Sequence, residues 1–233
     1  MINPRYNNNN ANNVKRKKIL DVLSEIEEIA RKDYLPSIGP IKGKIIGDII
    51  KKHKPKRILE IGTLHGYSAI LMANFLLSIN NDDYDDNDNT TKEIIVICLE
   101  IDKNFTNIAK KNIEKAGLSD KIKVINGDAL EIIPKLNNNN NHYRFDLIFI
   151  DAVKNQYLRY LKLVEENDLM NKEAAAVVVV IADNVLIYEN EMKDYLDYVR
   201  NSGLYNSYTT ETTLEFTKNV KDALEVSIRA NLD

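Results

Sequence analysis

Residues 57–72, RILEIGTLHGYSAILM, decide the fold. The apolar start RILEI predicts a buried strand, GTLHG predicts a tight turn, and YSAILM, with apolar residues at helical spacing, predicts a helix. Gly62 lets the backbone bend sharply or lie against a ligand, and the free N–H groups of the helix start would point at that ligand. Gly62 and Gly66 do not complete a three-glycine dinucleotide fingerprint, so a plain strand-to-helix turn stays open at this point.

Length and composition indicate one soluble domain. The chain has 233 residues, of which 44% are hydrophobic, and this is enough to bury one substantial core. A net charge of −3 argues against a protein that coats nucleic acid non-specifically. A single cysteine, Cys98, excludes a disulfide framework, and no apolar run approaches the length of a membrane span. We expect a cytoplasmic protein with a disordered Asn-rich tail at 1–14 and a single domain at 15–233.

Helical periodicity precedes the opening strand twice. The basic run KRKK at 15–18 is interpreted as the solvated start of a helix, although a contact to phosphate is an alternative. Its apolar stripe is Ile19, Val22, Leu23, Ile26 and Ile29. A second helix is predicted over 41–52, with its apolar face at Ile41, Ile45, Ile46, Ile49 and Ile50.

Strands and helices alternate along the rest of the chain. Continuous apolar runs predict further strands at 94–99, 122–125, 145–150 and 174–181, with helices at 105–116 and 154–166 and two C-terminal strands at 204–208 and 223–229. The segments 80–91 and 137–141 are acidic or Asn-rich and are predicted as loops. Such alternation predicts an α/β fold whose parallel sheet is covered by helices on both faces.

Polar residues follow five consecutive predicted strands. They are Gly62, Glu100, Asp128, Asp151, and Asp183 with Asn184. Any one of them could be a turn former or a helix cap, but the carboxyl ends of parallel strands meet at one edge of the sheet, where ligands bind. We therefore expect a site at this edge.

The residue types at this edge indicate its chemistry. Glu100, after the second strand, is placed to accept hydrogen bonds from the ribose hydroxyls of an adenosine-containing cofactor. Asp151, Asp183 and Asn184 offer hard oxygen ligands that suit magnesium, calcium or manganese and disfavour zinc. Lys154, one helical turn after Asp151, is a candidate general base, because a neighbouring cation disfavours its ammonium form. Without a metal it would be an ordinary exposed lysine.

Five segments together resemble one family, the metal-dependent and S-adenosylmethionine-dependent O-methyltransferases of the catechol and caffeoyl-coenzyme A type, including their prokaryotic relatives. The segments are LEIGTLHGYSAILMA, LEIDKNFTNIAKKNIEKAGL, INGDALEIIPKL, FDLIFIDAVKNQYLRYL and IADNVL, and the resemblance covers about residues 36–186. It implies a class I methyltransferase fold, a Rossmann-like and mostly parallel sheet of seven strands with helices on both faces.

The resemblance also implies roles for individual residues. Ser68 would hold the methionine carboxylate of the cofactor, Glu100 the ribose, and Asp128 with Ala129 would flank the adenine. The full set of expected cofactor contacts is Gly39, Glu60, Gly62, Thr63, Ser68, Glu100, Asp128, Ala129 and Asp151. Asp151, Asp183 and Asn184 would bind the metal, Mg²⁺ or another divalent cation such as Mn²⁺ or Ca²⁺, and Lys154 would take the proton of the acceptor hydroxyl.

The expected reaction is methyl transfer from S-adenosylmethionine to a hydroxyl of a small, catechol-like acceptor. Two departures bear on the acceptor: Val153 stands where many relatives have a carboxylate, and residues 171–173 replace a common Gly-Gly turn. The family's habit suggests a homodimer, and no membrane association is expected.

Two alternatives differ in class. Some relatives methylate a hydroxylated uridine in transfer RNA, and KRKK with Lys42, Lys44, Lys51, Lys52 and Lys54 could form the basic face that this requires. The acidic net charge places this function second. A non-catalytic cofactor-binding module is disfavoured, because the expected metal ligands and Lys154 are present.

Overall fold

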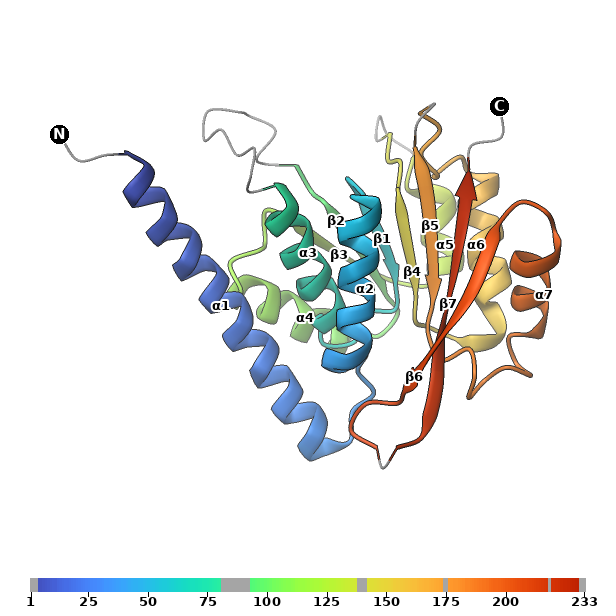
Figure 1. Cartoon of the computed structure of the whole chain (residues 1–233), viewed down its shortest axis with the longest axis horizontal. Helices are drawn as coiled ribbons and strands as arrows, with labels where there is room; N and C mark the ends of the chain where they lie inside the picture. Colours follow the sequence, from blue (N-terminus) through green and yellow to red (C-terminus); the bar gives the residue numbers. More distant parts are fainter. Residues whose placement is uncertain (1–3, 81–92, 138–141, 174–175, 218, 231–233) are drawn as a thin grey trace.

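The computed structural model describes residues 4–80, 93–137, 142–173, 176–217 and 219–230 (Figure 1). Most of the two predicted loops at 80–91 and 137–141 lies outside these residues. Within the described chain, no helix has both the length and the apolar composition needed to cross a bilayer.

One sheet of seven strands forms the centre of the molecule, in the order β3-β2-β1-β4-β5-β7-β6. The strands are β1 (Ile58–Ile61), β2 (Val96–Glu100), β3 (Ile122–Asn126), β4 (Leu147–Ile150), β5 (Val177–Ala182), β6 (Asn206–Thr213) and β7 (Lys221–Ala230). Strands β1 to β5 pair in parallel, and β7 runs antiparallel to both β5 and β6. The predicted seven-stranded, mostly parallel sheet is confirmed.

Helices cover both faces of this sheet (Figure 1). Helices α1 (Pro4–Asp33), α2 (Gly39–His53), α3 (Tyr67–Asn80) and α4 (Lys103–Lys115) pack on one face, and α5 (Ala129–Ile132), α6 (Tyr157–Glu166) and α7 (Lys193–Asn201) on the other. Alternate strand residues belong to different cores: Ile58 packs with the first group, and Leu59 with the second. Because side chains alternate along a strand, this two-sided burial explains why the strands are apolar throughout.

Two glycines of helix α2 face α3, and their lack of side chains lets the two helices pack closely. A Cβ atom at Gly43 would overlap Leu71, and one at Gly47 would overlap the ring of Phe75. The buried face of α2 includes Lys42, Gly43, Ile46, Gly47, Ile49 and Ile50. The predicted apolar face of this helix is therefore wrong at Ile41, which is 52% exposed. The interpretation of Lys42 as part of a basic surface is also wrong, because Lys42 is only 1% exposed.

Helix α1 also differs from its prediction. It begins at Pro4, so the segment expected to be disordered is helical from that residue onward, whereas the sequence predicts a helix only from residue 15. The predicted stripe is buried except for Ile29, which is 44% exposed, and Ala30 takes its place in the core. The short helices α5 and α7 were not predicted.

Candidate active site

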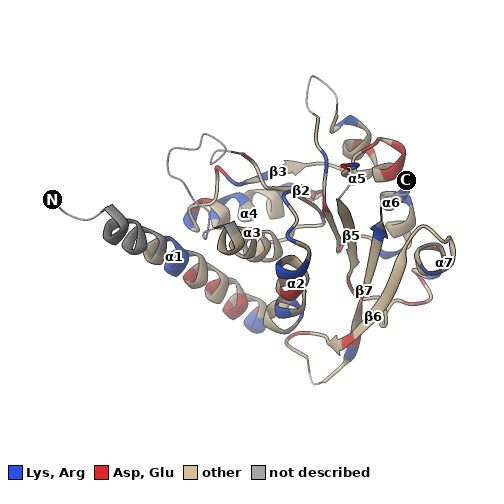
Figure 2. Cartoon of the chain, turned by 45° about the horizontal axis from the view of Figure 1, so that its top comes forward, with Lys and Arg blue, Asp and Glu red and all other residues tan. Residues whose placement is uncertain are grey.

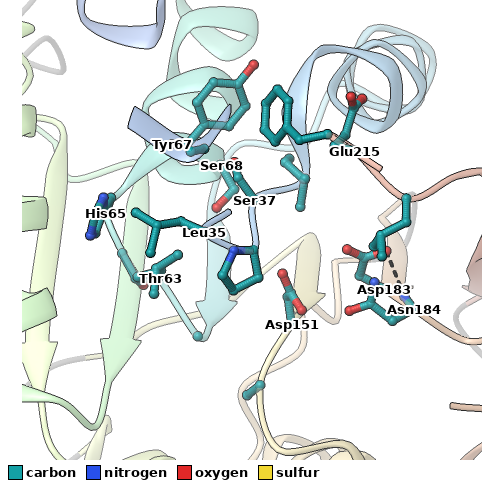
Figure 3. Close-up of a pocket in the computed structure, with 18 of the residues that line it drawn as sticks. Leu35, Ser37, Thr63, His65, Tyr67, Ser68, Asp151, Asp183, Asn184 and Glu215 are labelled. Atoms are coloured by element: carbon teal, nitrogen blue, oxygen red, sulfur yellow. Dashed lines mark hydrogen bonds between the residues drawn. The ribbon is translucent and has the colours of Figure 1, made fainter. Parts of the chain in front are cut away.

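A cavity of about 520 Å³ lies at the carboxyl ends of β1, β2, β4 and β5. The chain adds strands on one side of β1 and then on the other, and ligands bind at such a switch point in α/β sheets. Figure 3 shows side chains from these strand ends and from the 34–38 connection pointing into one space. The predicted site residues that line it are Gly62, Thr63, Ser68, Glu100, Asp151, Lys154, Asp183 and Asn184. The structure thus brings most of the predicted edge together.

The turn after β1 requires glycine at position 62, because a side chain would not fit there. The φ of Gly62 is 89°, in the left-handed region, and a Cβ atom there would overlap the backbone carbonyl of Asp151. The Gly62 N–H donates to the carbonyl of Leu99 on β2, 2.9 Å away. The turn is therefore fixed against both neighbouring strands, and only glycine permits this approach.

Glu100 holds the same turn from the end of β2. Its Oε2 accepts from the N–H groups of Thr63 (3.0 Å) and Leu64 (2.8 Å), and its Oε1 accepts from the N–H of Asp102 (2.9 Å). These bonds stabilise Leu64 in a left-handed conformation, with φ 48°, that a leucine rarely adopts. Two carboxylate oxygens offer about four acceptor positions, so Glu100 still has capacity for a ligand hydroxyl in the cavity that it lines.

Glu60 lies behind the cavity and does not line it. Its carboxyl group is 0% exposed and accepts hydrogen bonds from the hydroxyls of Ser68 and Thr63, which do line the cavity. Burial raises the pKa of Glu60 to about 7, and bonds from Ser68, Cys98 and Thr63 counteract this only in part. Glu60 therefore orients two cavity side chains from within the sheet instead of contacting a ligand.

Three other predicted cofactor contacts lie outside the cavity lining. Gly39 starts α2 with φ 56°, where a Cβ atom would overlap the side chain of Glu215. Asp128 caps α5 by accepting from the N–H of Leu130 at 2.8 Å, and Ala129 is buried at the start of that helix. The assignment of Gly39 to the cofactor, and of Asp128 with Ala129 to its adenine end, stays a prediction.

The predicted metal ligands converge at the ends of β4 and β5. Asp151 follows β4, and Asp183 with Asn184 follows β5. The backbone N–H of Asn184 donates to Asp183 Oδ1 at 2.7 Å, and Asn184 has φ 65°, a conformation that asparagine tolerates better than most residues. Burial, with the nearby charge of Asp151, raises the pKa of Asp183 to about 7 even though Lys42 and Lys154 act in the opposite direction, so this corner favours the binding of further positive charge.

Lys154 supplies a cation to this cluster. Its ammonium nitrogen lies 2.8 Å from Asp151 Oδ1, 2.7 Å from Asn184 Oδ1 and 2.9 Å from the hydroxyl of Tyr157. Asp151 Oδ1 and Asn184 Oδ1, which belong to two of the predicted cation ligands, thus both contact the Lys154 ammonium. These carboxylate and amide oxygens are of the kind that hard divalent cations prefer. Among the described residues no three His, Cys, Asp or Glu side chains group into a metal site, so a cation at this place would also need the Asn184 amide oxygen.

The sequence analysis missed two residues around the cavity. Glu215 lines it from the connection between β6 and β7, and its Oε1 accepts from the N–H of Ile41 at 2.6 Å. Lys42 lies behind the cluster, with its ammonium 2.5 Å from Asp183 Oδ1. The sequence does contain a signal that Lys42 is buried, because Lys42 falls four residues before Ile46 on the apolar stripe of α2. It contains no signal for the partners of Lys42.

Comparison with known proteins identifies the family. A sequence model described as O-methyltransferase matches residues 13–196. Catechol O-methyltransferase B of Danio rerio is 32% identical over 208 residues, which cover 89% of this chain and 71% of the relative, and the Mus musculus catechol O-methyltransferase is 29% identical over 85% of this chain and 67% of the relative. The structure is similar to an O-methyltransferase from Bacillus cereus in complex with SAH, with a TM-score of 0.71, 25% identity and 90% coverage of both chains. This chain therefore belongs to the O-methyltransferase family.

Proposed function

We propose that this protein transfers the methyl group of S-adenosylmethionine to a hydroxyl oxygen of a small acceptor, with a divalent cation bound in the site. One observation carries the proposal: a single cavity is lined both by the turn after β1 and by the Asp151, Asn184 and Lys154 cluster. A methyl donor and an ionisable acceptor could thus lie side by side, and such proximity accounts for much of the rate in group transfer.

The turn after β1 and the end of β2 would bind the donor. Glu100 would accept from the ribose, and Ser68, held by Glu60, would face the methionine end. The SAH complex of the similar Bacillus cereus enzyme supports this choice of donor. Because the Ser68 hydroxyl donates its one proton to Glu60, its oxygen offers lone pairs to the cavity, which suit the ammonium group of the methionine end. The predicted contact to the carboxylate would require this proton to turn away from Glu60.

Asp151, Asp183 and Asn184 would hold the cation. When bound, Mg²⁺, Mn²⁺ or Ca²⁺ would lower the pKa of an acceptor hydroxyl and orient its oxygen. Lys154 is the side chain placed to take the acceptor's proton, since its nitrogen reaches Asp151 and Asn184. It can do so only as the neutral amine, so its ammonium would first release a proton to solvent when a cation binds beside it. Lys154 lies three residues after Asp151, at the start of the short helix Lys154–Gln156, and its flexible stem could move aside while the carboxylate stays in place.

The remaining walls favour a compact, partly apolar acceptor. They comprise Ile26, Leu35, Pro36, Ile187, Tyr188, Leu214 and Phe216, with Glu215 as a carboxylate among them. A planar ring with adjacent hydroxyls would fit apolar walls while placing its oxygens at the Asp151 and Lys154 end. The catechol O-methyltransferase relatives support this acceptor class.

The charge distribution gives no support for transfer RNA as the acceptor. Along α1 the basic residues 15–18 are followed by acidic residues between 21 and 28 and then by Arg31 and Lys32, so the helix does not carry one continuous basic stretch (Figure 2). Lys42, one of the lysines assigned to that face, is buried and paired with Asp183. Small hydroxylated molecules therefore remain the preferred acceptors.

The test is methyl transfer from labelled S-adenosylmethionine to catechol, measured with magnesium and with a chelator. We expect transfer that the chelator abolishes and that Asp151→Ala removes. Chelator-resistant transfer in the Asp151→Ala variant would contradict the cation's role. Transfer only to hydroxyuridine-bearing transfer RNA would contradict the acceptor class. Homodimer formation and a cytoplasmic location stay predictions, to be checked by size-exclusion chromatography with light scattering and by cell fractionation.

A further inference from the structure

A buried lysine and a buried aspartate lie directly behind the proposed cation ligands. Lys42 reaches from α2 to place its ammonium 2.5 Å from Asp183 Oδ1 and 2.6 Å from Asp222 Oδ2. The side chains of Lys42 and Asp222 are 1% and 0% exposed. Neither residue lines the cavity. Buried charges of this kind are costly unless they are paired. Lys42, Asp183 and Asp222 therefore form one paired unit.

Asp222 also determines which end of the Asn184 amide faces the cavity. Asn184 Nδ2 donates to Asp222 Oδ2 at 2.8 Å, and a carboxylate can only accept. The amide nitrogen must therefore point at Asp222, which leaves Asn184 Oδ1 on the cavity side, where it accepts from Lys154 at 2.7 Å. An oxygen at that place can bind a cation, whereas an amide nitrogen cannot.

Lys42 fixes the neighbouring ligand in the same way. Both side-chain contacts described for Asp183, from Lys42 Nζ and from the N–H of Asn184, fall on Oδ1. The other oxygen, Oδ2, is thereby left for a ligand. Lys42 also offsets the charge of Asp222, without which that carboxylate would be buried uncompensated beside Asp183.

We propose that Lys42 and Asp222 are positioning residues for the cation site, with Asp222 selecting the oxygen of Asn184 and Lys42 selecting the free oxygen of Asp183. The inference rests on the cation dependence proposed above. Groups behind the ligands of a metal site commonly change metal affinity by about 10–100-fold when they are replaced.

The decisive variant is Asp222→Val, which removes both carboxylate oxygens from this buried strand position. Lys42 and Asn184 both donate to Asp222 Oδ2, so an asparagine with its amide oxygen at that place could keep both bonds, whereas valine accepts neither. The Asn184 amide thereby loses its fixed orientation, while Lys42 keeps its pair with Asp183. We expect Mn²⁺ affinity to fall about 10–100-fold, while the affinity for S-adenosylhomocysteine is unchanged. Mn²⁺ binding is read from the electron paramagnetic resonance signal of free Mn²⁺, and S-adenosylhomocysteine binding from calorimetry, so neither readout needs activity.

Asp146→Val is the matched control. Asp146 is also buried and also accepts from an asparagine, Asn171 Nδ2, at 2.6 Å, but it precedes β4 at the opposite end of the sheet. This variant should lose stability in the same manner and keep the Mn²⁺ affinity of the parent protein.

A double variant, Asn184→Asp with Asp222→Val, moves the buried carboxylate from position 222 to position 184. The new carboxylate presents an oxygen to the cavity whichever way it turns, so it needs no partner at 222 to orient it. We expect Mn²⁺ affinity to recover in the double variant. Unchanged Mn²⁺ binding in folded Asp222→Val, or no recovery in the double variant, would overturn the positioning role. A parent protein that binds S-adenosylhomocysteine but no Mn²⁺ would overturn the cation dependence itself.

Discussion

Replacing Glu60 by glutamine should change how the free energy of unfolding depends on pH. Glu60 is 0% exposed on the central strand β1, and burial raises its pKa from 4.5 to about 7 in the folded protein. The folded state therefore binds this proton more tightly than the unfolded state does. Stability from this group is complete below about pH 4.5 and is lost as the pH rises through about 7.

The size of the effect follows from the shift. Each pKa unit corresponds to about 1.4 kcal/mol, so the shift from 4.5 to about 7 amounts to about 3 kcal/mol between the protonated and the ionised protein. Because the group is fully buried, solvent screening does not reduce this figure. Glutamine resembles the protonated acid: it is neutral, and one of the Ser68 and Thr63 hydroxyls can turn to accept from its NH₂ group while the other still donates to its oxygen.

Urea unfolding at a series of pH values from about 5 to about 8 provides the assay. We expect Glu60→Gln to match the parent protein near pH 5 and to exceed its stability by up to about 3 kcal/mol near pH 8. A chelator is included throughout, so that the cation cluster is in the same state in both proteins. The pKa of Asp183 is also raised to about 7, but this contribution is common to both proteins and cancels in the difference.

Glu225→Gln serves as the matched control, since it removes a carboxylate of β7 that is equally buried but paired with Arg200. It should keep the pH slope of the parent protein. The reasoning would be refuted if the difference in free energy of unfolding between Glu60→Gln and the parent stayed constant from about pH 5 to about pH 8. A constant difference would show that Glu60 does not release its proton in the folded protein within this range.

Two further predictions concern packing and catalysis. Gly47→Ala should lower the free energy of unfolding by about 1–3 kcal/mol in urea titrations, because its Cβ would overlap the ring of Phe75 and push α2 from α3; a Gly47→Ala, Phe75→Leu double variant that recovers nothing would contradict this cause. Lys154→Met should reduce kcat for catechol about 10²–10⁴-fold, while calorimetric binding of S-adenosylhomocysteine stays unchanged. Methyl transfer at the parent rate would show that another group takes the proton.

The sheet and its ligand edge could be predicted because their signals are local. Each buried strand is a short apolar run, and a polar residue follows each at the point where the strand ends, so Gly62, Glu100 and Asp151 were found from the pattern alone. The cofactor and the roles of individual side chains came from the resemblance.

The residues that were missed depend on contacts between distant parts of the chain. Lys42 meets partners at positions 183 and 222, and nothing near it in the sequence marks it as paired. Glu215 reaches the cavity because β7 inserts antiparallel between β5 and β6, which returns the connection at 214–217 to the ligand edge. The sequence places Glu60 inside the first predicted strand. Its complete burial, however, depends on the helices that cover both faces of the sheet.

The contact between Gly62 and the carbonyl of Asp151 has a consequence for reaction distance. The turn that would carry the methyl donor lies directly against the strand end that would carry the acceptor: the Asp151 N–H donates to the carbonyl of Ile61 at 2.9 Å, and no side chain at Gly62 separates the two backbones. Their separation is kept short by this hydrogen bond and by the absence of a side chain, and a shift of about an ångström in such spacing can cost two orders of magnitude in rate. A methyl group added at position 62 would act as a spacer: each half could still bind its own ligand, but the sulfonium carbon and the attacking oxygen would no longer come within reach of each other.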